Sequence, residues 1–362
     1  MSVSVLTRRM AIDMTTRRAF LAGLAMASLP RLTWADVGNP AFLAAAKSAS
    51  GFVLHGLSEQ GQSLFSLPLP ARGHAACAHP TRALAVAFAR RPGTFALVID
   101  CASGAVLHQL DPPAGRHFNG HGVFSADGSV LMTSEVVAET SAGRIGLWDA
   151  SGFRRIGEWD SGGIGPHDIK LLPDGRLVVA NGGIQTTPNG RTELNIEAMR
   201  PNLTILSEGA IVDRAELAPE YHQNSIRHLA LLPDAIACAM QWHGDPADPV
   251  PLLGLWKPGQ APELCPAPEA MGLAMKGYAG SIAATNGRIA VTSAPGGLVM
   301  VFDATGAPLA SHFRADMCGI AAMGTDFIAT DGLGAAWHLG EEGLTLLGKQ
   351  PVAWDNHLIA LG

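Results

Sequence analysis

Histidine recurs at one position of a repeated strand pattern. His121 lies within GHGVFSADG (residues 120–128), six residues before the aspartate of an Asp-Gly turn. His74, Asp168 and His228 stand at the same distance before turns of their own. If these strands repeat one structural unit, their four side chains converge on one place. Imidazole and carboxylate groups together ligate iron, copper, zinc and manganese, so these four residues are candidate metal ligands.

Further polar residues are expected beside these four. They lie next to the strand starts or in the long segments 182–199 and 242–251, and long loops on a rigid scaffold often carry function. Six of them are candidate ligand-binding residues: Arg116, His117, His167, Asn181, Arg227 and His243. Glu135, Asn181 or Gln241, at neighbouring strand ends, could orient the metal ligands.

Three other interpretations of these residues stay open. The four could line a polar, water-filled opening that binds nothing. Arg116, Arg227 and Lys276, with protonated histidines, could instead bind a carboxylate or phosphate. Asp168 with a neighbouring histidine could act in general acid–base catalysis. Catalysis is permitted but not indicated, because the sequence contains no G-x-S-x-G, H-E-x-x-H or phosphate-binding loop.

The remaining histidines and cysteines suggest structural roles. His357 follows Asp355-Asn356, at what we expect to be the opposite end of its hairpin, and we assign it a structural role. Cys318 shares the position of the four candidate ligands, but we expect a small buried residue there. The five cysteines are scattered and form no C-x-x-C pair, which excludes a disulfide framework and leaves a single disulfide open.

A repeat that would position these residues runs along the chain. Segments 95–110, 144–159 and 298–313 each read as an alternating apolar strand ending in aspartate, a turn with glycine, and a second strand. Their aspartates are 49 and 154 residues apart, the second interval being close to three times the first. Hairpins of a second type, such as VFSADGSVLMTS and IKLLPDGRLVVAN, lie between them. Four strands in about 40–60 residues are typical of a β-propeller blade.

The repeat count predicts an all-β fold, a β-propeller of seven four-stranded blades, with six and eight as the alternatives. The C-terminal PVAWDNHLIALG (351–362) reads as a first hairpin that lacks its second, and the N-terminal part begins with a second hairpin that lacks its first. Pairing of the two termini would close the ring and cover the exposed edges. We therefore expect residues 36–362 to form a single propeller domain. The WD-like pair Trp148-Asp149 is too isolated to indicate the WD40 family.

The N-terminal segment resembles a twin-arginine export signal. TTRRAFL (15–21) contains the pair Arg17-Arg18, and an apolar run too short to span a bilayer follows it at 19–30. Thr33-Trp34-Ala35 offers a cleavage site, so residues 1–35 are the expected signal peptide. We expect a periplasmic protein without stable membrane insertion after cleavage, an uncleaved anchor being the alternative. The net charge of −6 argues against a nucleic-acid partner.

Together the leader, GHGVFSADG, PHDIKLLPDGRLVVANGG and the following LNIEAMRPNL resemble a bacterial family known as domain of unknown function 1513. The resemblance covers nearly all of the chain after the signal. It implies a propeller-like periplasmic protein whose gene often neighbours those of imelysin-type iron-regulated proteins and a dihaem thiol oxidoreductase. That context favours iron as the metal, and it assigns no catalytic residue.

The hypothesis that follows is a periplasmic accessory protein of iron (or related transition metal) acquisition. It would bind an ion, a chelate or another periplasmic iron-uptake protein at the His/Asp ring. The alternatives are a propeller enzyme, such as a metal-dependent hydrolase or oxidoreductase that uses the same ring, and a protein-interaction scaffold that uses the long loops.

Overall fold

The computed structural model describes residues 32–90, 93–188 and 192–361. The twin-arginine motif and the apolar run of the expected signal peptide lie outside these residues. The described part begins beside a short 3₁₀ helix, η1 (Trp34–Val37). No helix among the described residues is long and apolar enough to cross a membrane.

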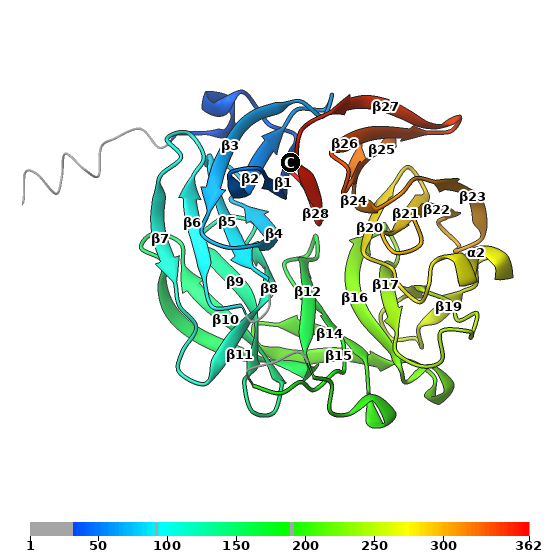
Figure 1. Cartoon of the computed structure of the whole chain (residues 1–362). Coiled ribbons are helices and arrows are strands. Elements are labelled where there is room, and N and C mark those ends of the chain that lie inside the picture. The colour runs from blue at the N-terminus through cyan, green and yellow to red at the C-terminus, as the bar shows by residue number, and fades with distance from the viewer. Residues whose placement is uncertain (1–31, 91–92, 189–191, 362) are drawn as a thin grey trace, which may run out of the picture.

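The strands form a ring of seven four-stranded antiparallel sheets, the blades of a β-propeller (Figure 1). Blade 1 contains β28 (Ala353–Ala360), β1 (Phe42–Ser48), β2 (Gly51–Leu57) and β3 (Ser63–Leu69). Blade 2 contains β4 (Gly73–Ala78), β5 (Leu84–Ala89), β6 (Ala96–Asp100) and β7 (Val106–Leu110). Blade 3 contains β8 (Arg116–Phe124), β9 (Val130–Val137), β10 (Ala142–Asp149) and β11 (Arg154–Ile164). The predicted seven-bladed fold is confirmed.

The other four blades continue in chain order. Blade 4 contains β12 (Pro166–Leu171), β13 (Leu177–Asn181), β14 (Asn202–Ser207) and β15 (Ala210–Glu216). Blade 5 contains β16 (Asn224–Leu231), β17 (Ile236–Trp242), β18 (Leu253–Trp256) and β19 (Glu263–Cys265). Blade 6 contains β20 (Ser281–Thr285), β21 (Arg288–Ser293), β22 (Leu298–Asp303) and β23 (Pro308–Phe313). Blade 7 contains β24 (Met317–Met323), β25 (Asp326–Asp331), β26 (Ala335–Gly340) and β27 (Gly343–Lys349).

Short helices occupy some of the connections between strands. Two 3₁₀ helices, η2 (Ile196–Ala198) and η3 (Pro219–Tyr221), follow β13 and β15, and α2 (Glu269–Ala274) leads into blade 6. All five cysteines are buried and free, as expected of scattered strand cysteines.

Blade 1 closes the ring with strands from both ends of the chain. β28 pairs antiparallel with β1, and Figure 1 shows it as the innermost strand of its blade, facing the channel. The edge of β1 is therefore paired, which removes an exposed edge that could template aggregation. The predicted closure by pairing of N- and C-terminal strands is confirmed.

The turn chemistry explains why the outer hairpins repeat. Asp100 ends β6 and accepts a hydrogen bond from the backbone N–H of Ala102 (2.9 Å), and Gly104 then adopts a positive φ of 75°. Asp303 ends β22 in the same way, accepting from Thr305 N–H (2.8 Å) before Gly306, whose φ is 84°. An aspartate that caps its own turn and a glycine at positive φ are what such a tight reversal requires.

Apolar side chains fill the spaces between blades. Each of the seven interfaces between neighbouring sheets contains its own cluster of buried hydrophobic residues. Trp256, for example, is fully buried between blades 4 and 5. The core is therefore distributed around the ring, and the channel between the innermost strands is left for polar side chains.

Candidate metal centre

Interrupted strand pairing positions the polar side chains in the channel. In six blades the pairing between the innermost strand and its neighbour shifts register at one level, whereas blade 6 pairs without a shift. His74, His121, His167 and His357 lie within the skipped stretches, and His228 borders one. Such bulges free residues from the ladder and redirect their side chains.

Five imidazoles from five consecutive blades meet at this level. We call them the histidine cluster: His357, His74, His121, His167 and His228, from blades 1 to 5 in that order. Their ring centroids lie 4.4 to 5.8 Å from those of their neighbours in the cluster. All are buried except His74, which is half-buried. The channel is therefore filled at this depth by nitrogen donors.

Four members of the cluster have nitrogen atoms close enough to share an ion. One ring nitrogen from each of His74, His121, His167 and His357 lies within 4.8 Å of the other three. The Nε2 atoms of His74 and His357 are 3.3 Å apart. Four nitrogens around a tetrahedral ion at 2.0–2.1 Å lie about 3.3 Å from each other, so a small inward movement of the rings would complete a site.

Two buried nitrogen atoms in the cluster have no hydrogen-bond partner among the described residues. They are His121 Nε2 and His167 Nδ1. A buried polar atom normally has a partner, because leaving it unsatisfied costs about 1–3 kcal/mol. An ion held by these nitrogens would supply the missing partner. The residues present therefore fit a transition metal.

Asp168 lies behind His121. Asp168 Oδ1 is 3.3 Å from His121 Nδ1 and accepts a hydrogen bond from the N–H of Ile169 (2.9 Å). Its Oδ2 accepts from the N–H of Leu229 (3.0 Å) and lies 3.6 Å from Lys170 Nζ. Both oxygens are thus engaged. An Nδ1–H donated to this carboxylate leaves His121 Nε2 with a lone pair, as in the carboxylate–histidine–metal arrangement.

The environment keeps three of the imidazoles neutral. Burial and, after it, the charges of the other cluster histidines hold the pKa of His167 and of His357 well below the usual range. Burial likewise lowers the pKa of His228 to about 3. Burial alone would raise the pKa of Asp168, but Lys170 and His121 outweigh it and keep this carboxyl ionised. Neutral imidazole is the form that binds a metal ion.

Glycine makes room for this arrangement beside His121. Gly120 has a φ of 97°, and a Cβ there would lie 2.3 Å from the imidazole of His74. A Cβ on Gly122 would lie 2.5 Å from the ring of Phe88 in the core of blade 2. The two glycines of GHG therefore allow His121 and His74 to approach each other and blade 3 to pack against blade 2.

Openings approach the cluster from both ends of the channel. The larger, of about 1080 Å³, is lined by the later parts of the inner strands, including His121, Asp168 and Lys170. The smaller, of about 200 Å³, is lined by the beginnings of those strands and by the segment after β13. His74, His167 and His228 face the smaller opening, so the cluster lies between the two.

Three of the four predicted metal ligands lie in the histidine cluster, and the fourth lies behind it. Sequence register proposed His74, His121, Asp168 and His228. The structure places both His74 and His121 among the four closest imidazoles, with His228 beside them, 4.9 Å from His167 and 4.8 Å from His357 by ring centroids. Asp168 contacts His121 and backbone amides and lies outside the four-histidine group.

His167 and His357, rather than Asp168 and His228, complete the group of four close imidazoles. His167 was expected among the ligand-binding residues, and it precedes Asp168 within the same interrupted stretch. The expected position of His357 at the opposite end of its hairpin is wrong, because β28 is an inner strand and brings this side chain into the cluster. The signal was present: NHLIA at 356–360 resembles RHLAL at 227–231, which contains His228.

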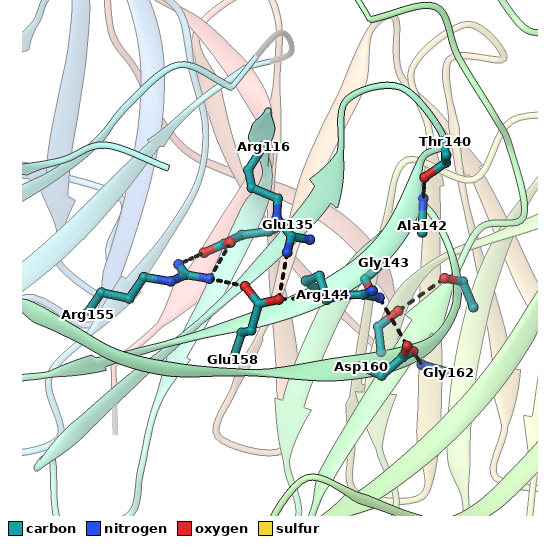
Figure 2. A network of polar contacts seen from close by, with 12 residues as sticks. Arg116, Glu135, Thr140, Ala142, Gly143, Arg144, Arg155, Glu158, Asp160 and Gly162 are labelled. Carbon is teal, nitrogen blue, oxygen red and sulfur yellow. Dashed lines mark hydrogen bonds and ion pairs between the residues drawn. The ribbon is translucent and has the colours of Figure 1, made fainter. Parts of the chain in front are cut away.

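Arg116 belongs to a polar network on blade 3 (Figure 2). Its Nη2 lies 2.6 Å from Glu158, which also pairs with Arg144 and Arg155. Glu135, considered above as support for a metal ligand, is fully buried and accepts two hydrogen bonds from Arg155. These contacts hold β9 and β11 together, and neither residue lines the openings described above.

Asn181 and His117 also lie apart from the cluster. Asn181 is buried and hydrogen-bonded to Ser161, Asn202 and Thr204, which ties β13 to its neighbours. His117 Nε2 lies 3.1 Å from the carbonyl oxygen of Pro188. The structure gives both side chains partners within the fold.

Arg227 and His243 lie closer to the centre. Arg227 lines the smaller opening beside His228, and the sequence had placed it among the ligand-binding residues. His243 Nδ1 is 3.2 Å from the carboxylate of Glu193, which lines the same opening. Gln241, proposed as a supporting residue, lines it too.

Comparisons with known proteins bear on the fold and on the family. Residues 67–361 match the family model described as Protein of unknown function (DUF1513). A chain of Kuenenia stuttgartiensis hydrazine synthase is similar in structure, with a TM-score of 0.55 at 12% sequence identity, over 83% of this chain and 89% of that one. At this identity the likeness concerns the fold alone. No curated protein matches the sequence.

Proposed function

Because the chain belongs to the DUF1513 family, whose description names no activity, we propose its function from the site itself. The protein binds one transition-metal ion in the histidine cluster and serves as a periplasmic accessory protein of iron, or related metal, acquisition. The observation that carries the proposal is the group of four imidazoles whose nitrogens lie within 4.8 Å of one another.

The donor set narrows the choice of ion. Imidazole nitrogen suits iron, zinc, copper and nickel, whereas magnesium and calcium prefer oxygen ligands. The engaged oxygens of Asp168 leave imidazoles as the donors nearest one another. Bound metal would supply Lewis-acid or redox chemistry to a ligand that enters from either opening. The chain's own part is to hold His167, His228 and His357 neutral, to orient His121 through Asp168 and to restrict access.

The first experiment measures the metal content of the protein purified from the periplasmic fraction by elemental mass spectrometry. We expect about one equivalent of a transition metal in the wild type and in His108→Ala, which removes an exposed imidazole on β7. A His121→Ala/His167→Ala variant is expected to lose it. Absence of metal from the wild type, even after incubation with Fe(II), Zn(II) and Cu(II), would contradict the proposal.

Export and a role in iron acquisition rest on the leader motif and on the family resemblance, and are tested separately. Replacing Arg17 and Arg18 by lysine should leave the precursor in the cytoplasm, since the twin-arginine pair is the export signal. A deletion strain should grow more slowly than its parent under iron limitation and recover with the wild-type gene. Recovery with the His121→Ala/His167→Ala gene would separate that role from the metal site.

A further inference from the structure

The smaller opening contains a buried cation that forms no direct ion pair with a described carboxylate. Arg227 lies in the interrupted stretch of β16 and is 8% exposed. Its Nε has no hydrogen-bond partner among the described residues, and no ion pair joins its guanidinium to a described carboxylate. A buried charge without a partner costs several kcal/mol, so proteins rarely retain one unless it meets a ligand.

The nearest acidic side chain is engaged elsewhere. Glu193 lines the same pocket, but its carboxylate lies 3.2 Å from His243 Nδ1. The other ionisable groups around Arg227 are Tyr278, Arg90 and the cluster histidines. Arg90 adds a second positive charge to the lining. The pocket is therefore electropositive.

Neutral hydrogen-bond groups surround the two arginines. Asn356 Nδ2 donates to Tyr278 Oη (2.6 Å), which leaves the phenol hydrogen able to point into the pocket. The lining also includes the amide of Gln241, whereas Asn119 Nδ2 already donates to the carbonyl oxygen of Pro166. Guanidinium, phenol and amide donors around one space are suited to an oxoanion, and arginine binds carboxylates through two parallel N–H groups.

The pocket reaches the histidine cluster directly. His74, His167 and His228 form part of its wall, together with Arg227. Its volume of about 200 Å³ is below the 300–1,000 Å³ usual for drug-sized ligands, so its occupant is small. An anion with a further oxygen beyond the pair held by Arg227 would offer that oxygen to a metal in the histidine cluster, since His74, His167 and His228 line the same pocket.

We propose that this pocket binds a small carboxylate-bearing anion, such as carbonate, oxalate or a small di- or tricarboxylate, between Arg227 and the metal in the histidine cluster. Binding of the anion by Arg227 is argued from the pocket alone. Its bridging to the metal rests on the proposed function. Such an anion would neutralise Arg227 and complete the coordination of the ion. It would also make metal binding depend on the anion.

The test uses Co(II), whose visible spectrum reports its ligands, with bicarbonate, oxalate, citrate and phosphate titrated in a Hepes buffer free of other anions. We expect carboxylates to change the Co(II) spectrum and to bind the Co(II)-loaded wild type at least about 10-fold more tightly than Arg227→Gln. Arg227→Lys should be intermediate because it keeps the charge without the planar fork. Arg200→Gln, which changes an exposed arginine paired with Glu216, should match the wild type.

Thermal unfolding without metal tests the pocket independently. Without anion, Arg227→Gln should unfold at the same temperature as the wild type or a higher one, since it removes an uncompensated buried charge. Oxalate or citrate should raise the unfolding temperature of the wild type only. The inference would be overturned if Arg227→Gln were strongly destabilised and carboxylates changed the unfolding temperature of neither protein. Arg227 would then have a structural role.

The possible failures are distinguishable. Co(II) bound at the cluster with no response to any carboxylate overturns the anion proposal and leaves the metal function standing. Stabilisation by phosphate alone also overturns it. If the protein binds carboxylates through Arg227 but binds no metal, the result supports the anion pocket. It refutes both the bridge to the metal and the proposed metal function.

Discussion

Blades 1–5 and blades 6–7 build the same sheets but present different side chains to the channel. Each of the first five contributes one imidazole, whereas blades 6 and 7 have Gly280 and Cys318 at the corresponding position. Gly280 serves packing, because a Cβ there would lie 2.7 Å from the ring of Tyr278. Since blades 6 and 7 form without a channel histidine, the fold does not require one. The five histidines therefore call for a functional explanation.

The two regions also differ in how their polar groups are satisfied. In blades 6 and 7 the Oγ1 of Thr292 donates to the carbonyl oxygen of Cys318, and Ser281 Oγ accepts from the N–H of Ile320 (3.3 Å). In blades 3 and 4, His121 Nε2 and His167 Nδ1 remain without a described partner. Arg288 Nε in blade 6 and Thr330 Oγ1 in blade 7 also lack a described partner, so the difference concerns the channel imidazoles, which blades 6 and 7 do not supply.

The largest effect is expected when blades 3 and 4 lose their channel imidazoles and so resemble blades 6 and 7. His121→Ala/His167→Ala should lower metal affinity by more than about 100-fold, beyond the range for partners that only orient a ligand. Equilibrium titration with Zn(II) against a chromophoric chelator measures it. The circular dichroism spectrum should stay that of the wild type. Unchanged affinity in a folded variant would refute the assignment of these ligands.

A smaller loss is expected when the carboxylate behind His121 is changed. Asp168→Asn keeps the shape but no longer holds His121 Nδ1–H as a charged acceptor, so metal affinity should fall about 10- to 100-fold. The same titration applies, with Asp174→Asn on an exposed turn as the matched control. A loss as complete as in the double variant would instead make Asp168 a direct ligand.

Acidity should weaken the apoprotein through the cluster histidines whose pKa burial lowers, which are His167, His228 and His357. The pKa of His228 is about 3 in the fold, against about 6.5 in an unfolded chain, so between these values the unfolded state binds more protons. The free energy of unfolding should therefore fall as the pH drops below about 6.5, by up to about 1.4 kcal/mol per pH unit for each such histidine. Urea denaturation at pH 7.5 and 5.0 measures it.

His228→Gln sharpens this prediction. The variant should lose less stability than the wild type between the two pH values, by up to about 2 kcal/mol, because one proton-binding difference is removed. His108→Gln on β7 changes an exposed histidine outside the cluster and serves as the control. Equal pH dependence in His228→Gln and the wild type would show that His228 is not kept neutral by burial.

The smallest effect is expected in blade 7. Cys318→Ala removes a buried thiol, and burial raises the pKa of Cys318 above its usual range, so the residue is a protonated thiol at neutral pH rather than a thiolate. Metal affinity should change less than about 2-fold, within ordinary measurement error for such titrations. A loss of 10-fold or more would extend the site into blade 7 and remove the contrast between the two regions.

The fold could be predicted because each structural unit leaves a local signal. Asp100 and Asp303 mark equivalent turns in the sequence, and those turns fix where the strands on either side begin and end. The spacing of such turns gave the blade count. Closure followed from a hairpin without its partner hairpin at each end of the repeat, and the structure closes the blade with one C-terminal strand, β28, paired with β1.

The site was predictable only in part, for two physical reasons. Counting back from a turn found His74, His121 and His228, but it failed for His357 because the strand that pairs with β28 lies at the other end of the chain. Alternation also assumes regular pairing. The interruption in β12 frees consecutive residues, so His167 enters the cluster while Asp168 turns behind His121. No rule of strand periodicity describes that exchange.

X-ray absorption at the metal edge of the loaded wild-type protein tests whether the imidazoles of the histidine cluster bind the metal. We expect the metal to have about four nitrogen neighbours at roughly 2.0–2.2 Å, with the outer-shell scattering pattern of imidazole rings. His121→Ala/His167→Ala should lose that pattern. A metal surrounded by oxygen or sulfur without imidazole scattering, or a protein that binds no metal at all, would contradict the histidine cluster as a metal centre.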